Sequence, residues 1–185
     1  EDFYVTAPLI GRHSVYTMLR SAAAALSLGF SWDWIFYALK TSNLQLRIAT
    51  TKTASGALLI DDTYNASPDS TLAALNLLED LTGRKVAVLG DMLELGQYEE
   101  DGHQRVGIRA AQVADEIVLV GQRSLQTQAA ALESGFAPNQ IHWFADANSA
   151  ARYLRETLKE KDIALVKGSH AMRMDLIVAS LEVIS

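Results

Sequence analysis

The chain of 185 residues contains no cysteine, only three prolines, and fewer basic than acidic side chains. Without cysteine it can form neither disulfides nor thiolate zinc sites, which fits a reducing compartment, and we expect the cytoplasm. A formal net charge of -6 leaves no basic stripe to displace counterions from phosphates, so we expect no nucleic-acid partner. Charged residues interrupt every apolar run well before the ~20 residues that a membrane helix needs, so we expect no membrane insertion.

Several motifs of catalytic and metal sites are missing as well. The sequence has no G-x-x-x-x-G-K-[ST] loop to hold phosphates and no G-x-G-x-x-G turn of a dinucleotide site. Its four histidines show no H-x-x-x-H spacing, and no G-x-S-x-G elbow presents a nucleophilic serine. We therefore predict no catalytic residue and no metal ligand within this chain.

The beginning of the chain has the pattern of two helices within residues 11–40. Apolar residues recur at helical spacing up to Gly29, and Ser31 is suited to cap a second, aromatic-rich helix. The pair has too few apolar residues for a core of its own, so we expect residues 1–42 to end a domain whose main body is missing. The chain also begins at Glu1 rather than at methionine, which favours a segment of a longer polypeptide.

From about residue 44, short apolar runs alternate with helical stretches. Residues 44–51 and 57–62 flank a glycine-containing loop at 52–56, which predicts an antiparallel hairpin. The later strands are joined by helix-length crossovers, which force them parallel. We predict an α/β fold, namely a Rossmann-like, mostly parallel six-stranded sheet with helices on both faces. The remaining expected strands are residues 85–90, 116–121, 141–145 and 163–167, and the expected helices are residues 69–81, 98–114, 123–134, 147–159 and 171–183.

Ligands of an open α/β sheet bind beyond the carboxyl ends of its strands, and three loops there are rich in polar residues. The first loop contains two adjacent carboxylates, Asp61 and Asp62, followed by Tyr64 and Asn65. This combination suits ribose hydroxyls and a base, and a solvated loop is the alternative. Ser67, further along, is expected to cap the next helix.

The other two loops are less specific. The second lies between two glycines and places Asp91 at the end of a buried strand, where a tight turn covering the sheet edge is the alternative to a ligand site. His103, further along, is expected on a helix surface. The third loop, residues 167–173, carries positive charge in an otherwise acidic chain. In it Gly168 permits a close approach of backbone to a ligand, and Ser169 is suited to cap the last helix, leaving amide groups to face an anion.

Four stretches of the sequence resemble motifs of the Mur ligases, in particular of the members that add D-alanyl-D-alanine. Residues 59–70 are similar to the motif D-D-x-Y-N-A-N-P-x-S, and residues 89–96 with His103 are similar to L-G-D-M-x-E-L-G…H. Residues 166–175 resemble V-K-G-S-R-x-M-x-M-E, and residues 11–14 resemble the G-x-H-N that starts the last helices of the family's central ATPase domain. The resemblance covers nearly the whole chain.

This resemblance implies part of an ATP-dependent ligase of peptidoglycan synthesis. ATP and magnesium are the implied cofactors, and UDP-muramoyl tripeptide and D-alanyl-D-alanine are the implied substrates. The family's P-loop, magnesium ligands and carbamylated lysine belong to its central domain, upstream of this chain. The resemblance assigns residues 1–42 to the end of that domain and residues 43–185 to the carboxy-terminal domain, which closes over ATP and helps to hold the dipeptide. The isolated chain is therefore predicted to be inactive.

Individual site residues follow from the same resemblance. Asp62 matches an aspartate that binds the ribose hydroxyls, and Arg47 matches an arginine that reaches the ATP phosphates. The expected nucleotide-binding residues are Asp62, Arg47, Tyr64, Asn65 and His13. The expected substrate-binding residues are Lys167, Ser169, Arg173, Asp91 and Glu94.

Two alternatives stay open at this point. A folylpolyglutamate-type or cyanophycin-type ligase shares the architecture, although Tyr64, Asn65 and the loop at 90–96 favour the D-alanyl-D-alanine adder. A self-standing α/β module that binds a nucleotide or another ligand, without catalysis, is the alternative from another class. A P-loop motif encoded upstream of Glu1 favours the ligase, whereas a start codon near that residue favours the module.

Overall fold

The computed structural model describes residues 12–41 and 49–182, without the side chains of residues 12–14 and 40–41. The chain divides into two compact units, Glu1–Ile48 and Ala49–Ser185. The described part of the first unit is the predicted helical pair, α1 (Arg12–Ser27) and α2 (Trp32–Thr41). Ser31 caps α2 as expected, because its Oγ accepts a hydrogen bond from the backbone nitrogen of Trp34 at 3.4 Å.

The second unit is built on a six-stranded sheet in the order β1-β2-β6-β3-β4-β5. Strand β1 pairs antiparallel with β2, and all other neighbouring strands are parallel, which confirms the predicted hairpin and the crossover argument. Part of the predicted first strand, residues 44–48, lies outside the described residues. The strands are β1 (Ala49–Lys52), β2 (Leu58–Asp62), β3 (Lys85–Gly90), β4 (Glu116–Val120), β5 (Ile141–Phe144) and β6 (Ile163–Lys167).

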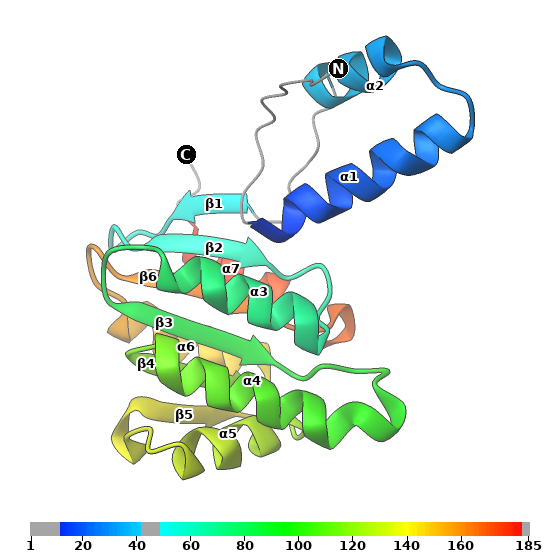
Figure 1. The fold of residues 1–185 in the computed structure, drawn as a ribbon. Helices are drawn as coiled ribbons and strands as arrows, with labels where there is room; N and C mark the ends of the chain where they lie inside the picture. Colours follow the sequence, from blue (N-terminus) through cyan, green and yellow to red (C-terminus); the bar gives the residue numbers. More distant parts are fainter. Residues whose placement is uncertain (1–11, 42–48, 183–185) are drawn as a thin grey trace. The chain divides into compact units, whose positions relative to one another are not determined.

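Helices cover both faces of the sheet, as predicted (Figure 1). Three helices that pack in sequence lie on one face, and two that pack on each other lie on the opposite face. The first group is α3 (Pro68–Glu79), α4 (Glu99–Val113) and α5 (Ser124–Glu133), and the second is α6 (Ala147–Thr157) and α7 (Asp175–Leu181). None of the helices in the parts of the chain that the structure describes is long and apolar enough to cross a membrane.

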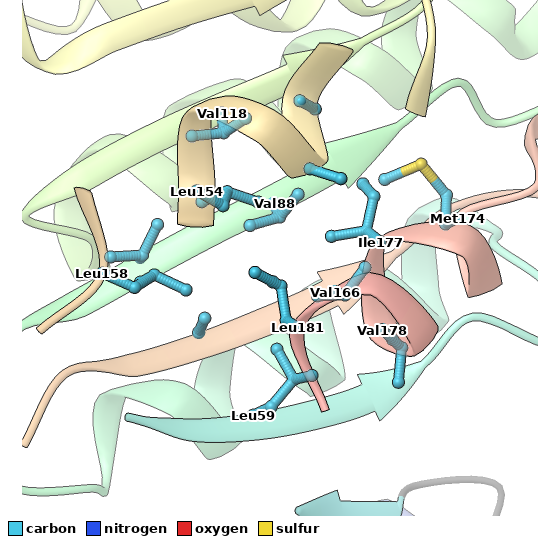
Figure 2. Packing of buried hydrophobic residues seen from close by; sticks show 14 of the residues in the cluster. Leu59, Val88, Val118, Leu154, Leu158, Val166, Met174, Ile177, Val178 and Leu181 are labelled. Atoms are coloured by element: carbon cyan, nitrogen blue, oxygen red, sulfur yellow. The ribbon is translucent and has the colours of Figure 1, made fainter. Parts of the chain in front are cut away.

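The core beneath α6 and α7 consists of interdigitated aliphatic side chains (Figure 2). Leu59, Val88 and Val166 point from three neighbouring strands toward the two helices, which contribute Leu154 and Ile177. All five residues are fully buried. Each such side chain contributes about 1.5–3 kcal/mol through removal of apolar surface from water, so this layer holds the strand ends in fixed positions.

A network of ion pairs lies at the amino-terminal ends of the parallel strands. Arg84, just before β3, hydrogen-bonds to the carboxylate of Glu116 at the start of β4 and, at 2.6 Å, to that of Asp162 just before β6. Strands β4 and β6 flank β3 in the sheet. The Tyr153 hydroxyl donates to Glu116 Oε1 at 2.8 Å, and the His142 ring lies beside the Tyr153 ring. The Glu116 side chain is only 3% exposed. This network therefore ties three strands and α6 together at the edge opposite the polar loops.

We predict that Tyr153→Phe destabilises the fold in a pH-dependent manner. Burial, followed by the hydrogen bond to Glu116, raises the pKa of Tyr153 from 10.0 to about 12. The neutral phenol is thus favoured by folding, so its stabilisation is complete below pH 10 and is lost as the pH rises toward 12. A hydrogen bond to a charged group contributes about 1.5–3 kcal/mol, and we expect the lower end for this partly exposed ring.

Urea unfolding of the chain and of the variant at neutral pH and at about pH 11 measures this effect. The difference in the free energy of unfolding between the unsubstituted chain and Tyr153→Phe should be smaller at the higher pH. Tyr98→Phe is the matched control, because the Tyr98 ring is exposed and its loss should change the free energy of unfolding by less than about 0.5 kcal/mol. An equal destabilisation by Tyr153→Phe at both pH values would contradict the prediction.

The last helix differs from the prediction. Instead of one helix over residues 171–183, a short 3-10 turn (His170–Met172) precedes α7, which starts at Asp175. Arg173 separates them, because it has a left-handed backbone with φ 52°, and such a residue cannot continue a right-handed helix. Apolar residues at helical spacing continue through this break, so the sequence predicts one uninterrupted helix.

Candidate functional site

The topology brings the three polar loops to one edge of the sheet. Strands β2, β6 and β3 are adjacent and parallel, so their carboxyl ends, at Asp62, Lys167 and Gly90, lie side by side. The loop after β6, which is third in the sequence, is therefore the middle one in space. A single site can be contacted by residues from all three loops, as the sequence analysis anticipated for an open α/β sheet.

The first loop is held in shape from both ends. Asp61 accepts hydrogen bonds from the backbone nitrogen and the hydroxyl of Thr63, so its carboxylate forms a local turn. Ser67 caps α3 as predicted, in a reciprocal capping box with Ser70. Between these points Tyr64 is 60% exposed, and an exposed aromatic ring can stack on a flat ligand.

Asp62 and Lys167 form a buried ion pair at the centre of this edge. Lys167 Nζ donates to Asp62 Oδ2 at 2.7 Å and to the backbone oxygen of Asn65 at 2.8 Å. Lys167 is only 2% exposed. The family resemblance implies different ligands for these two charged residues, and their direct contact was not predicted.

The second and third loops are hydrogen-bonded to each other. The backbone nitrogen of Ser169 donates to the backbone oxygen of Asp91 at 3.0 Å, and the Ser169 hydroxyl accepts from the backbone nitrogen of Leu93 at 2.8 Å. The expectation that Ser169 caps the last helix is therefore wrong, because its hydroxyl faces the neighbouring loop. A Cβ on Gly168 would lie 2.7 Å from Met174 Cγ, so the absence of a side chain here permits close packing against Met174.

Asp91 also supports the fold. Its Oδ1 accepts from the backbone nitrogen of Ser124, near the start of α5, at 2.8 Å, and Asp91 is buried. A Cβ on Gly121, which has φ 100°, would lie 2.6 Å from the same carboxylate, so only glycine fits there. Glu94, in contrast, is exposed, and its backbone is left-handed with φ 63°. The substrate-binding roles of both acidic residues stay predictions.

His103 is buried, which corrects the expectation that it lies on a helix surface. It is 1% exposed and fastens the second loop to α4. The backbone nitrogen of Met92 donates to Nε2 at 3.2 Å, so Nδ1 carries the proton that is shared with the backbone oxygen of Glu99 at 2.8 Å. A buried histidine thus determines the shape of the loop that Asp91 begins.

Arg173 is exposed, and its hydrogen bond to Asp175 lowers the pKa of that carboxyl group. The His170 ring lies 6.4 Å from the Tyr64 ring, so the first and third loops meet at the surface. Arg47 lies outside the described residues, and His13 belongs to α1 without a described side chain. Among residues 12–41 and 49–182, no group of three histidine or acidic side chains could hold a metal ion.

The fold and its loops define a Rossmann-like α/β domain with a candidate ligand site beyond the carboxyl ends of its parallel strands. Residues 46–170 match the family described as Mur ligase, glutamate ligase domain. Because this match covers more than half of the chain, the chain belongs to the Mur ligase family.

Similar proteins have the same fold. The UDP-N-acetylmuramoyl-tripeptide–D-alanyl-D-alanine ligase of Escherichia coli (strain K12) is 35% identical over 96% of this chain and 39% of its own length. A crystal structure of MurF from Acinetobacter baumannii has a TM-score of 0.79 at 31% identity, covering 97% of this chain and 39% of that one. The MurF ligase of Thermotoga maritima in complex with ADP shares the fold, with a TM-score of 0.71 at 24% identity over 92% and 38% of the two chains. This chain thus spans about two fifths of the length of its relatives.

Proposed function

We propose that this chain is the carboxy-terminal part of an ATP-dependent ligase that adds D-alanyl-D-alanine to UDP-N-acetylmuramoyl tripeptide in peptidoglycan synthesis. The observation that carries the proposal is the convergence of three loops, each similar to a motif of that enzyme class, at one edge of the sheet. The named relatives that align with nearly the whole chain support the same substrates. Cytoplasmic location is part of the proposal and fits a chain without cysteine.

The nucleotide side of the site consists of the first loop. Asp62 supplies a carboxylate, the acceptor that ribose hydroxyls need, and Tyr64 presents an exposed ring beside it. Asn65 adjoins both, and its side chain accepts from the backbone nitrogen of Ala66. Arg47 and His13 complete the proposed set through the family resemblance alone. Bound ATP would supply the phosphoryl group that activates a carboxylate, with magnesium held by residues of another domain.

The third loop forms the proposed dipeptide side. Arg173 is exposed and positively charged, so it can pair with the carboxylate of D-alanyl-D-alanine. Ser169 and Asp91 are proposed to shape this side, because the hydrogen bond between their backbones joins the second and third loops. Glu94, three residues after Asp91, is exposed, and its carboxylate is proposed to pair with the ammonium group of the dipeptide.

We propose that residues 1–42 belong to the end of a central ATPase domain and residues 43–185 to the carboxy-terminal domain. The division of the chain into Glu1–Ile48 and Ala49–Ser185 supports a boundary in this region. The exposed aromatic side chains of α2, including Trp34 and Tyr37, support a larger domain around the helical pair, because burying such rings is favourable. A P-loop motif encoded upstream of Glu1 is expected on this proposal.

The isolated chain of 185 residues is predicted to neither hydrolyse ATP nor ligate the dipeptide. Phosphoryl transfer depends on positioning and charge neutralisation by a phosphate-binding loop and magnesium, and the sequence contains no P-loop. Phosphate release from magnesium-ATP, with UDP-muramoyl tripeptide and D-alanyl-D-alanine present, measures the activity. Turnover comparable to that of an intact ligase would show that the chemistry lies within this chain and would overturn the proposed division of labour.

A further inference from the structure

The ion pair between Lys167 and Asp62 is fixed by the register of two strands. Asp62 and Lys167 are the last residues of β2 and β6, and they are direct partners in this parallel pair. Partners on adjacent strands lie on the same face of a sheet about 4.8 Å apart, so the lysine side chain meets the carboxylate without any contribution from loop flexibility. The pair is therefore a built feature of the sheet edge.

The burial of Lys167 argues against a direct contact with the dipeptide. An ammonium group that is removed from water must be paired, and the partners of Lys167 are Asp62 Oδ2 and the backbone oxygen of Asn65. To reach a dipeptide carboxylate, the ammonium would have to break both of these hydrogen bonds. Arg173, on the same loop, pairs with Asp175, but both side chains are exposed to water, so Arg173 can exchange partners without leaving a buried charge unpaired.

The same contacts fix the proposed nucleotide-binding residues in place. One N–H fixes the orientation of the Asp62 carboxylate, and another holds the backbone at Asn65, so the segment that carries Tyr64 is clamped at both ends. The positive charge also offsets the repulsion between the Asp62 carboxylate and the phosphates of a nucleotide. Removing the ammonium would therefore affect both the geometry and the charge of the ribose-binding group.

We propose that Lys167 is a positioning residue for the nucleotide, acting through Asp62 and the first loop, and that it does not bind the dipeptide. This inference rests on the proposed function, because it assumes that Asp62 binds the ribose. It replaces the substrate-binding role that the resemblance implied for Lys167 with a role in ATP binding.

The test is a kinetic comparison in the full-length polypeptide that carries this chain. Lys167→Met keeps the aliphatic stem and removes the ammonium. We expect the KM for ATP to rise about tenfold or more, the fold-change of losing roughly one charge-assisted hydrogen bond, while the KM for D-alanyl-D-alanine changes less than about twofold. A general loss of structure would alter both KM values, so this split separates positioning from a merely structural role.

A double variant shows whether Lys167 acts through Asp62. Because Lys167→Met leaves a buried carboxylate without its cation, the variant Lys167→Met/Asp62→Asn removes both charges and keeps the inference testable if the single variant does not fold. The KM for ATP of the double variant is compared with that of Asp62→Asn and, if it folds, with that of Lys167→Met. The double variant should have a KM for ATP close to that of Asp62→Asn, because the lysine then acts only through the aspartate.

The outcomes distinguish the inference from the proposed function. If Asp62→Asn raises the KM for ATP but Lys167→Met raises the KM for the dipeptide instead, or changes neither, the positioning role is overturned. Additive effects on the KM for ATP would also overturn it. If Asp62→Asn leaves the KM for ATP unchanged, the nucleotide role of Asp62 fails, and with it the proposed function of the first loop.

Discussion

Replacing Arg84 by methionine is expected to lower the free energy of unfolding by about 3 kcal/mol, because it leaves two buried carboxylates without their shared cation. The side chains of Glu116 and Asp162 are 3% and 7% exposed, so both carboxylates depend on partners within the protein. The expectation lies at the low end of the range for broken buried pairs. Glu116 keeps the hydroxyl of Tyr153, and Asp162 keeps the backbone nitrogen of Lys159.

Arg105→Met is the matched control for this change. Arg105 also forms an ion pair, with Asp69 at 3.3 Å, but both side chains are largely exposed, and such pairs contribute about 0–1 kcal/mol. Urea unfolding of both variants measures the two effects, with the free energy obtained by linear extrapolation. Equal effects of the two substitutions would contradict the role assigned to the amino-terminal edge network.

Asp62→Ala and Arg47→Ala are each expected to reduce kcat/KM for ATP about tenfold to a hundredfold in the full-length polypeptide. A hydrogen bond to a charged group contributes about 1.5–3 kcal/mol, and each factor of ten corresponds to about 1.4 kcal/mol. For Asp62 the loss should be at least as large as for Arg47, because its removal also leaves the Lys167 ammonium buried beside an empty space.

Asp61→Asn is the control for the neighbouring carboxylate. Its Oδ1 accepts from Thr63, a bond that the amide oxygen can retain, so we expect kcat/KM for ATP to change less than about twofold. Steady-state rates at varied ATP, with both other substrates saturating, give these values. Unchanged ATP kinetics in both Asp62→Ala and Arg47→Ala would remove these residues from the nucleotide site.

The sheet could be predicted because its signals are local. The glycine-containing loop at 52–56 fixes an antiparallel hairpin, and each later strand follows a crossover long enough for a helix. The Ser67 cap could also be predicted, since its partner lies three residues away. These features depend on neighbours in the sequence, which the amino-acid pattern displays directly.

The contacts that shape the site could not be predicted from local pattern. The buried His103 accepts a hydrogen bond from the backbone nitrogen of Met92, which lies eleven positions earlier in another loop. The pairing of Lys167 with Asp62 joins residues 105 positions apart and depends on strand order. The left-handed Arg173 that delays α7 has no glycine or asparagine to signal it. Motif resemblance located all three loops but not the bonds between them.

The central claim is that this chain completes an ATP-dependent dipeptide ligase, and product analysis tests it most directly. The full-length polypeptide is incubated with magnesium-ATP, UDP-muramoyl tripeptide and D-alanyl-D-alanine, and the products are identified by mass spectrometry. The account predicts a tripeptide precursor extended by the dipeptide with loss of water, formed together with equal amounts of ADP and phosphate. Nucleotide binding without any extended product, from an active and folded preparation, would contradict it.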